Sequence, residues 1–283
     1  MPNMIEVKDL YKSYKKVEAV KGIDFTIGEG SFFALLGENG AGKSTTIRII
    51  ATLTRKTSGE VLVNGHRVDR DDHSIRRDIG VVFQGHTLDR HLSVRENIIC
   101  RGALYGLSRR EAETRLTSLA HKIGVADFMN RRYGHLSGGQ KRRADILRAL
   151  INEPRVLILD EPTTGLDPHT RQSVWETILG LKKENGLTVF LTTHYMEEAA
   201  GADHIVIMDR GLVCASGTPE QLCLKYSTDR LILIPREGDR AAAMLRDGSI
   251  PHTAGRGRIV VPLKDSLEAI EIIDRVRDTI EGL

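Results

Sequence analysis

Cysteine is scarce in this sequence of 283 residues. The three that occur, Cys100, Cys214 and Cys223, form no Cys-x-x-Cys pair, and their number is odd. Neither a disulfide framework nor a cysteine-based zinc site is therefore indicated. This usage is typical of reduced cysteines in a cytosolic protein.

Long apolar runs are also missing. A helix that spans a bilayer needs roughly 18 consecutive apolar residues, and no run of that length occurs. The first residues, MPNMIEVKDL, lack the basic-then-apolar pattern of a secretory signal. If the protein works at a membrane, we therefore expect a separate chain to supply the membrane-spanning part.

Neither sign of charge is in large excess. Lys and Arg number 41 and Asp and Glu 38, which leaves a formal net charge of +3. A balance this even gives no reason to expect a nucleic-acid partner. With 40% hydrophobic and 28% charged residues, the chain has the profile of an ordinary globular protein with ample material for a core.

Apolar segments punctuated by glycine indicate strands up to about residue 85. The segments are Ile5–Val7, Ile23–Ile27, Phe32–Leu36, Glu60–Val63 and Ile79–Phe83. A helical pattern fills about 86–152, and strand character returns at Val156–Asp160, Thr188–Thr193 and Ile205–Asp209 with helical segments between. This alternation predicts an α/β fold with a doubly wound parallel sheet, interrupted by a helical insertion.

The pattern breaks around Gly217–Pro219. We predict one domain over 1–219 and a second, small α/β domain over 220–283. The second domain carries no catalytic constellation, so we interpret it as a packing or dimerising accessory.

One glycine-rich loop satisfies the phosphate-binding pattern G-x-x-x-x-G-K-[ST] in full. It consists of Gly37, Glu38, Asn39, Gly40, Ala41, Gly42, Lys43 and Ser44, and Thr45 follows. Glycines let successive backbone N–H groups face a polyphosphate, and the next helix adds its positive N-terminus. We predict that these residues bind ATP or GTP, that Lys43 reaches the β- and γ-phosphates, and that Ser44 coordinates Mg²⁺.

A second motif is the apolar strand VLILD, which ends in two carboxylates. An Asp at this place can hold Mg²⁺, and the adjacent Glu can polarise an attacking water as general base. We assign these roles to Asp160 and Glu161 respectively.

A third motif consists of Leu136, Ser137, Gly138, Gly139 and Gln140. Ser137 and the two glycines form another N–H-rich turn at the start of a helical segment, hence a second anion-binding terminus. One nucleotide does not need two such loops from one chain. The second loop makes sense if it covers the γ-phosphate of a nucleotide held by another copy.

Together these motifs resemble the ABC ATPase family, from Met4 to about Pro219. The resemblance implies a P-loop NTPase core of the RecA-like kind, an antiparallel β subdomain and a helical subdomain at about 86–152. It also implies that two copies sandwich two ATP molecules head to tail, with Mg²⁺, and that hydrolysis reopens the pair.

The resemblance gives roles to further residues. Tyr14 matches the aromatic residue that stacks on adenine, with Tyr11 as the alternative, and Gln84 matches the glutamine that joins Mg²⁺ to the helical subdomain. His194 matches the switch histidine that contacts the γ-phosphate. The D-loop corresponds to Gly165, Leu166 and Asp167.

Two kinds of machine remain open. One is a membrane transporter whose permease is a separate chain, and the other is a soluble ATPase that acts on nucleic acid, ribosomes or cofactor assembly. A single cassette without a long coiled coil favours the transporter. The stretches LTRKTSGEVLVNG, SIRRDIGVVFQ and EPTTGLDPHTRQSVWE resemble the ATPase subunits of bacterial ABC-2-type exporters of the daunorubicin-resistance kind.

That finer resemblance implies export of drugs, lipids or polysaccharides from the cytoplasmic face of the membrane. It places the groove for the permease at about Gly85–Ile98, so we expect charge reversal at Arg95 or Glu96 to uncouple transport. The sequence carries no information about the cargo.

Overall fold

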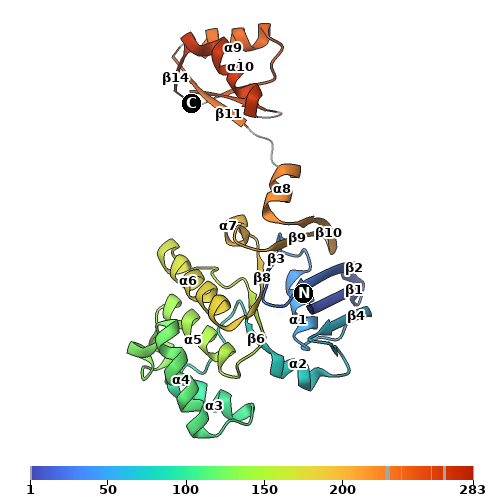
Figure 1. The fold of residues 1–283 in the computed structure, drawn as a ribbon, viewed down its shortest axis with the longest axis vertical. Helices are drawn as coiled ribbons and strands as arrows, with labels where there is room; N and C mark the ends of the chain where they lie inside the picture. Colours follow the sequence, from blue (N-terminus) through green and yellow to red (C-terminus); the bar gives the residue numbers. More distant parts are fainter. Residues whose placement is uncertain (1, 227–229, 237, 256, 264–265, 283) are drawn as a thin grey trace. The chain divides into compact units, whose positions relative to one another are not determined.

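The computed structural model describes residues 2–226, 230–236, 238–255, 257–263 and 266–282 (Figure 1). The chain divides into two compact units, Met1–Glu220 and Gln221–Leu283. Among the described residues, no helix combines the length and the apolar character that crossing a membrane requires.

A six-stranded sheet forms the centre of the first unit, in the order β10-β9-β3-β8-β7-β6. Its strands are β3 (Phe32–Gly37), β6 (Ile79–Val82), β7 (Val156–Asp160), β8 (Thr188–Thr193), β9 (His204–Asp209) and β10 (Leu212–Gly217). All neighbours pair in parallel except β10, which forms a hairpin with β9. The middle strands β3, β7 and β8 are apolar runs because both of their faces are buried.

Helices alternate with these strands and cover the sheet (Figure 1). They are α1 (Lys43–Ile50), α2 (Asp72–Asp78), α6 (Pro168–Asn185) and α7 (Met196–Ala199). Parallel strands all end at the same edge of a sheet. The ends of β3, β7 and β8 therefore bring the phosphate-binding loop, the two carboxylates and His194 to one edge.

A second, antiparallel sheet packs against the first. It has the order β2-β1-β4-β5, with β1 (Asn3–Tyr14), β2 (Val17–Gly28), β4 (Ser58–Val63) and β5 (His66–Arg67). The two sheets share one apolar core, in which Phe25 stacks on Phe33 with ring centroids 5.2 Å apart.

Both long strands extend well beyond the predicted segments Ile5–Val7 and Ile23–Ile27. Register shifts interrupt their pairing, for example between Val7 and Leu10. Such bulges break the alternation of apolar and polar residues, so the sequence pattern displays only part of each strand.

The insertion predicted at 86–152 is helical. It contains α3 (Val94–Leu104), α4 (Arg109–Ile123), two 3₁₀ turns (Ala126–Phe128 and Tyr133–His135) and α5 (Gly138–Leu150). Each of the three α-helices begins with a reciprocal capping box, Ser93 with Glu96, Ser108 with Glu111 and Ser137 with Gln140. The serine satisfies an unpaired N–H of the first turn, which fixes where each helix starts.

Two buried arginines of α5 tie this insertion to the central sheet. Arg142 donates to the carbonyls of Phe83 and Gln84 at 2.7 and 3.2 Å, and Arg148 donates to the carbonyl of Val81. Burial lowers the pKa of both guanidinium groups, and the neighbouring Asp145 carboxylate opposes that shift. The end of β6 is thus bound to the helix that starts at the Leu136–Gln140 motif.

In the second unit, an antiparallel sheet of order β12-β13-β11-β14 packs against two helices. The elements are β11 (Arg230–Pro235), α9 (Gly238–Asp247), β12 (Thr253–Gly255), β13 (Arg258–Pro262), α10 (Ser266–Val276), the 3₁₀ turn Arg277–Thr279 and β14 (Ile280–Gly282); α8 (Pro219–Tyr226) precedes them. This β-α-β-β-α-β succession is the ferredoxin-like arrangement. Its core is formed by Leu233, Leu245, Ile259, Val261, Ile272 and Val276, among others.

Candidate nucleotide-binding site

A pocket of about 300 Å³ lies at the edge of the central sheet. Its walls are Tyr14, Ala19, Asn39, Gly40, Gly42, Lys43, Ser44, Thr45, Gln84 and Glu161. These residues come from the end of β1, the start of β2, the loop before α1 with the first turn of that helix, the end of β6 and the end of β7. The fold thus gathers into one pocket four segments that the sequence analysis singled out separately.

Glycine is required at two positions of the loop. Gly37 and Gly42 have φ of 155° and 106°. A Cβ at Gly37 would lie 2.3 Å from the carbonyl oxygen of Met208, and one at Gly42 would lie 2.6 Å from that of Ala19. Gly42 is also the N-cap of α1 and has no side chain with which to cap it. The N–H groups of the first turn are therefore left for an anion.

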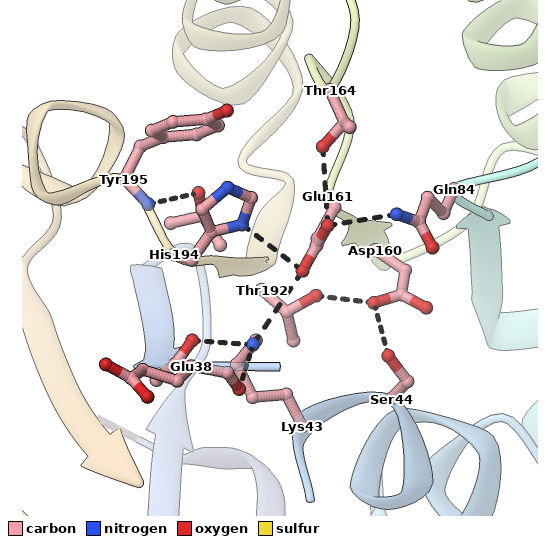
Figure 2. Close-up of polar contacts among 12 residues, drawn as sticks. Glu38, Lys43, Ser44, Gln84, Asp160, Glu161, Thr164, Thr192, His194 and Tyr195 are labelled. Carbon is pink, nitrogen blue, oxygen red and sulfur yellow. Dashed lines mark hydrogen bonds and ion pairs between the residues drawn. The ribbon is translucent and has the colours of Figure 1, made fainter. Parts of the chain in front are cut away.

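Lys43 is buried beneath this loop. Its ammonium donates to the carbonyls of Gly37 and Glu38 at 2.7 and 3.0 Å, and it lies 3.7 Å from the Glu161 carboxylate (Figure 2). Burial lowers the pKa of the Lys43 amine, and the carboxylates of Glu161 and Asp160 oppose that shift. The charge is thus held at the pocket wall, paired but with no contact to bulk solvent.

Ser44 and Asp160 form an oxygen-rich corner of the site (Figure 2). The Ser44 hydroxyl donates to Asp160 Oδ1 at 3.2 Å, and the Thr192 hydroxyl donates to the same oxygen at 2.6 Å. Mg²⁺ prefers hydroxyl and carboxylate oxygens and keeps several of its waters. The hydroxyl of Ser44 and the carboxylate of Asp160 are oxygen groups of the kind that fits such an ion.

Glu161 is the centre of the polar network. It accepts from Gln84 Nε2 at 3.1 Å and from the Thr164 hydroxyl at 3.3 Å, and His194 Nδ1 lies 3.4 Å from its other oxygen (Figure 2). Its backbone has φ of 47°, a left-handed conformation that costs energy for a residue with a Cβ. This turn directs the carboxylate into the pocket directly after the strand ends.

The structure separates the two candidate tyrosines. Tyr14 lines the pocket, is 43% exposed, and has the Lys12 ammonium 4.6 Å from its ring centroid. Tyr11 is not among the residues that line the pocket, and its ring lies against Gly22 instead. Tyr14 is therefore the ring available for stacking at this pocket.

The Leu136–Gln140 motif and the Gly165–Asp167 segment lie together, away from this pocket. None of these eight residues is among those that line it. A Cβ at Gly139 would lie 2.4 Å from the Thr170 methyl group, in the first turn of α6. Asp167 caps that helix by accepting from the backbone N–H and the hydroxyl of Thr170 at 3.0 and 2.6 Å, and these bonds lower the pKa of its carboxyl.

Comparison with known proteins identifies this arrangement. Residues 20–164 match the sequence model of the ABC transporter family. The chain belongs to the ABC transporter family.

Relatives of this ABC transporter protein include the daunorubicin resistance ATP-binding protein DrrA3 of Streptomyces coeruleorubidus. The two are 38% identical over 96% of this chain and 87% of that protein. The Nod factor export ATP-binding protein I of Rhizobium sp. (strain N33) is 41% identical over 77% of this chain and 72% of its own length. Among solved structures, the dimeric post-hydrolysis state of the ATP-binding cassette MJ0796, bound to ADP and Pi, has a TM-score of 0.70. It is 32% identical and covers 76% of this chain and 99% of that one.

The chain is accordingly an ATP-binding subunit and ATPase of the ABC transporter type, with the P-loop NTPase fold. Three residues of the ABC transporter site were not predicted. They are Ala19 in the pocket wall, Thr164, which donates to Glu161, and Thr192, whose hydroxyl shares Asp160 Oδ1 with Ser44. The signal for Thr192 is present in the sequence, because Thr192 is the residue before the last in the strand TVFLTT, and Asp160 is the last in VLILD. Only the pairing of β7 with β8 shows that the two residues meet, because it places Asp160 opposite Thr192.

Proposed function

We propose that this chain hydrolyses ATP with Mg²⁺ in a head-to-tail dimer and thereby drives export through a separate membrane protein. The observation that carries the chemistry is that Lys43 and Glu161 line one pocket, with Asp160 in contact with Ser44 of the same pocket. A buried lysine, a carboxylate beside a serine hydroxyl and a second carboxylate are the parts that phosphoryl transfer requires.

In the proposed mechanism, the β- and γ-phosphates of ATP lie on the N–H groups at the start of α1. Lys43 exchanges its ion pair with Glu161 for the phosphates, which frees that carboxylate to polarise the attacking water. His194, now 3.4 Å from Glu161, contacts the γ-phosphate. Tyr14 stacks on the adenine ring.

Mg²⁺ supplies neutralisation of the phosphate charge when it is bound. Ser44, Asp160 and Gln84 would hold the ion, and the amide nitrogen of Gln84 now faces Glu161. Arg142 binds the carbonyl of the same glutamine, so a shift at the phosphate end is transmitted to α5.

In the proposed dimer, the other copy covers the γ-phosphate from outside. Leu136, Ser137, Gly138, Gly139 and Gln140 are proposed to supply that cover from the partner copy. Their location away from the pocket of their own chain, and the dimeric form of the similar cassette MJ0796, both support this proposal. Gly165, Leu166 and Asp167 would lie at the same interface, next to Gly139.

A groove of about 560 Å³ offers a docking place for the membrane partner. Its lining includes Leu53, His73, Arg76, Arg77, Phe83, Arg101, Leu104 and Arg148. Two leucines of this set, Leu53 and Leu104, are 58% and 77% exposed. The groove contacts the end of β6 through Phe83, next to Gln84, so a segment seated there would sense the nucleotide site.

The predicted contact residues Arg95 and Glu96 do not line this groove. Arg95 pairs with Glu113 at 2.5 Å, and Glu96 closes the capping box with Ser93. Charge reversal at Arg95 would break this pair between α3 and α4, and reversal at Glu96 would remove the capping box of α3. We propose that the coupling contact includes the groove lined by the C-terminal end of α3.

The direction of transport follows from the relatives. DrrA3 is named for daunorubicin resistance and the Rhizobium protein for Nod factor export. We propose that this chain likewise powers export, from the cytoplasmic face of the membrane, of a cargo selected by the membrane partner.

Affinity purification of the tagged chain from gently solubilised membranes of its native host tests this proposal. We expect a stoichiometric multi-spanning protein to co-purify. Recovery only from the soluble fraction with bound nucleic acid or ribosomes would overturn the exporter and leave the ATPase chemistry in place.

A further inference from the structure

A buried carboxylate outside the nucleotide pocket is linked to His194 by a chain of contacts. Glu198 lies in α7, four residues after His194, and is 6% exposed. None of the roles proposed above uses it. Burial of a carboxylate costs free energy unless hydrogen bonds or charges compensate for it. The partners of Glu198 therefore indicate its structural role.

The first link joins His194 to Tyr195. Their rings lie with centroids 4.0 Å apart and planes at 40°, and Figure 2 shows the tyrosine ring beside the imidazole. The backbone N–H of Tyr195 donates to the Thr193 hydroxyl at 3.0 Å. The imidazole is therefore held between the Tyr195 ring on one side and Glu161 at 3.4 Å.

The second link joins Tyr195 to Arg171. The Arg171 guanidinium lies 4.8 Å from the centroid of the Tyr195 ring, a cation–π contact. Arg171 belongs to the first turns of α6, just after Asp167 in the D-loop. Its Nε lies 4.0 Å from Glu198 Oε1.

The last link returns to the strand end. The buried Thr163 hydroxyl donates to Glu198 Oε1, and Thr163 stands two residues after Glu161 in the chain. Glu198 is thus the point where the segment after the proposed base and the cation above Tyr195 meet. The contacts form a closed circuit that begins and ends at Glu161.

We propose that Glu198 is a positioning residue for ATP hydrolysis that acts on His194. Its carboxylate anchors Arg171, the guanidinium holds the Tyr195 ring, and the ring fixes the imidazole facing Glu161. The consequence for catalysis rests on the γ-phosphate role proposed for His194, whereas the positioning of the imidazole does not.

The surroundings make Glu198 open to substitution. Glu198 Oε2, Arg171 Nε and Trp175 Nε1 have no hydrogen-bond partner among the described residues, and their side chains line a pocket of about 410 Å³. The pocket is lined mainly by apolar groups. Because Glu198 already holds a buried oxygen without a partner, loss of the carboxylate also removes a cost of burial. The Glu198→Gln variant, which keeps the size of the side chain, shows whether an effect of Glu198→Ala comes from the lost volume.

NMR of the imidazole in the full chain tests the positioning. The ring signals of His194, assigned by their loss in His194→Gln, are compared in Glu198→Ala, Glu198→Gln, Tyr195→Leu and Tyr195→Phe. We expect both Glu198 variants and Tyr195→Leu to shift the His194 signals in the same direction, because the stacked ring is displaced or lost. In Tyr195→Phe the ring remains, so the signals should stay near their native positions. Glu197→Gln, which changes the neighbouring exposed acid on the same pocket, is the matched control. Native His194 signals in both Glu198 variants would overturn the proposal.

ATPase kinetics then measure the consequence. We expect Glu198→Ala and Tyr195→Leu to lower kcat between about tenfold and a hundredfold, the range that a small misplacement produces, with KM for ATP nearly unchanged. The Tyr195→Phe variant, which keeps the aromatic ring, should have a kcat close to that of the native chain. Full activity of His194→Gln would refute the role given to His194 in the proposed function, and the imidazole signals would still decide the positioning.

Discussion

At the scale of single residues, the site contains an ion pair that the proposed mechanism breaks. Lys43 and Glu161 lie 3.7 Å apart and both are buried. Charges of both signs are thereby held at the pocket with little exposure to solvent. In the proposed mechanism, a bound phosphate chain gives the lysine a new partner, and the released carboxylate polarises the attacking water.

Glu161→Gln is expected to bind ATP and to hydrolyse it between about a hundredfold and ten thousandfold more slowly, the range for loss of a general base. Because the ATP-bound pair then persists, Mg-ATP should convert the variant to a dimer in gel filtration. Glu153→Gln, an exposed acid paired with Arg115, should behave as the native chain. A purely monomeric Glu161→Gln would refute the base assignment or the sandwich.

Lys43→Ala is expected to weaken ATP binding between about tenfold and a hundredfold, the value of hydrogen bonds to a charged group. The fold should remain intact by circular dichroism, since the lysine contacts only loop carbonyls and Glu161. Lys183→Ala, on the exposed face of α6, is the control. Unchanged affinity in Lys43→Ala would contradict the loop assignment.

The same lysine predicts a pH dependence. Its contribution to ATP affinity is present while the amine is protonated and is lost as pH rises through its pKa. Burial lowers that pKa from its usual 10.5, and Glu161 opposes the shift. Titration of ATP binding should therefore show the alkaline loss at lower pH in Glu161→Gln than in the native chain. An identical profile in both would argue against the ion pair.

At the scale of elements, three helices start with the same device but serve different ends. The capping boxes of α3 and α4 complete structure alone, while that of α5 uses the serine of the Leu136–Gln140 motif. Because the capping geometry is the same, the contribution of an N-cap serine to the free energy of unfolding can be measured with Ser108. That contribution can then be separated from any role of Ser137 in dimerisation.

Ser137→Ala and Ser108→Ala are both expected to lower the free energy of unfolding by about 1 kcal/mol, the usual cost of losing an N-cap. Only Ser137→Ala should also lose ATP-driven dimerisation and ATPase activity, since only that helix start is proposed to cover the partner's γ-phosphate. Chemical denaturation and gel filtration with Mg-ATP check the two effects. If both variants lost the dimer to the same extent, Ser137 would act only as the N-cap of α5.

At the scale of the whole molecule, the groove beside α3 and the nucleotide pocket both reach the end of β6, the groove through Phe83 and the pocket through Gln84. Leu104, which also lines the groove, is 77% exposed. A partner segment that packs on Leu104 would lie between cationic side chains of α2 and α3, so apolar and anionic groups together would suit it.

Leu104→Glu is expected to reduce recovery of the membrane partner about tenfold or more, as loss of an apolar anchor does at interfaces. ATP affinity of the isolated chain should not change, because the pocket shares no lining residue with the groove. Leu212→Glu, an exposed leucine on β10, is the control. Equal recovery with both variants would exclude this groove as the docking place.

How much the sequence predicted can be judged from particular residues. Three motifs could be recognised because each is a run of consecutive residues whose chemistry depends on local backbone geometry. They are the loop Gly37–Ser44, the carboxylates Asp160 and Glu161, and the Leu136–Gln140 motif. The α/β fold followed from the alternation of apolar strands with helices. The full extents of β1 and β2 and the short strands β12 and β14 could not be predicted, because bulges and three-residue strands leave no periodic pattern.

The sequence by itself determined the chemical groups of this ABC transporter subunit: a phosphate-binding loop, a candidate aspartate for Mg²⁺ and a candidate base, each within a few consecutive residues. Only the tertiary structure decided which of two tyrosines faces the pocket, that Thr192 shares an oxygen with Ser44, and that Glu198 reaches His194 through Arg171. These are contacts between strand ends and helix starts far apart in the chain. They exist because a parallel sheet brings the carboxyl ends of its strands to one edge, and no local pattern encodes which side chains meet there.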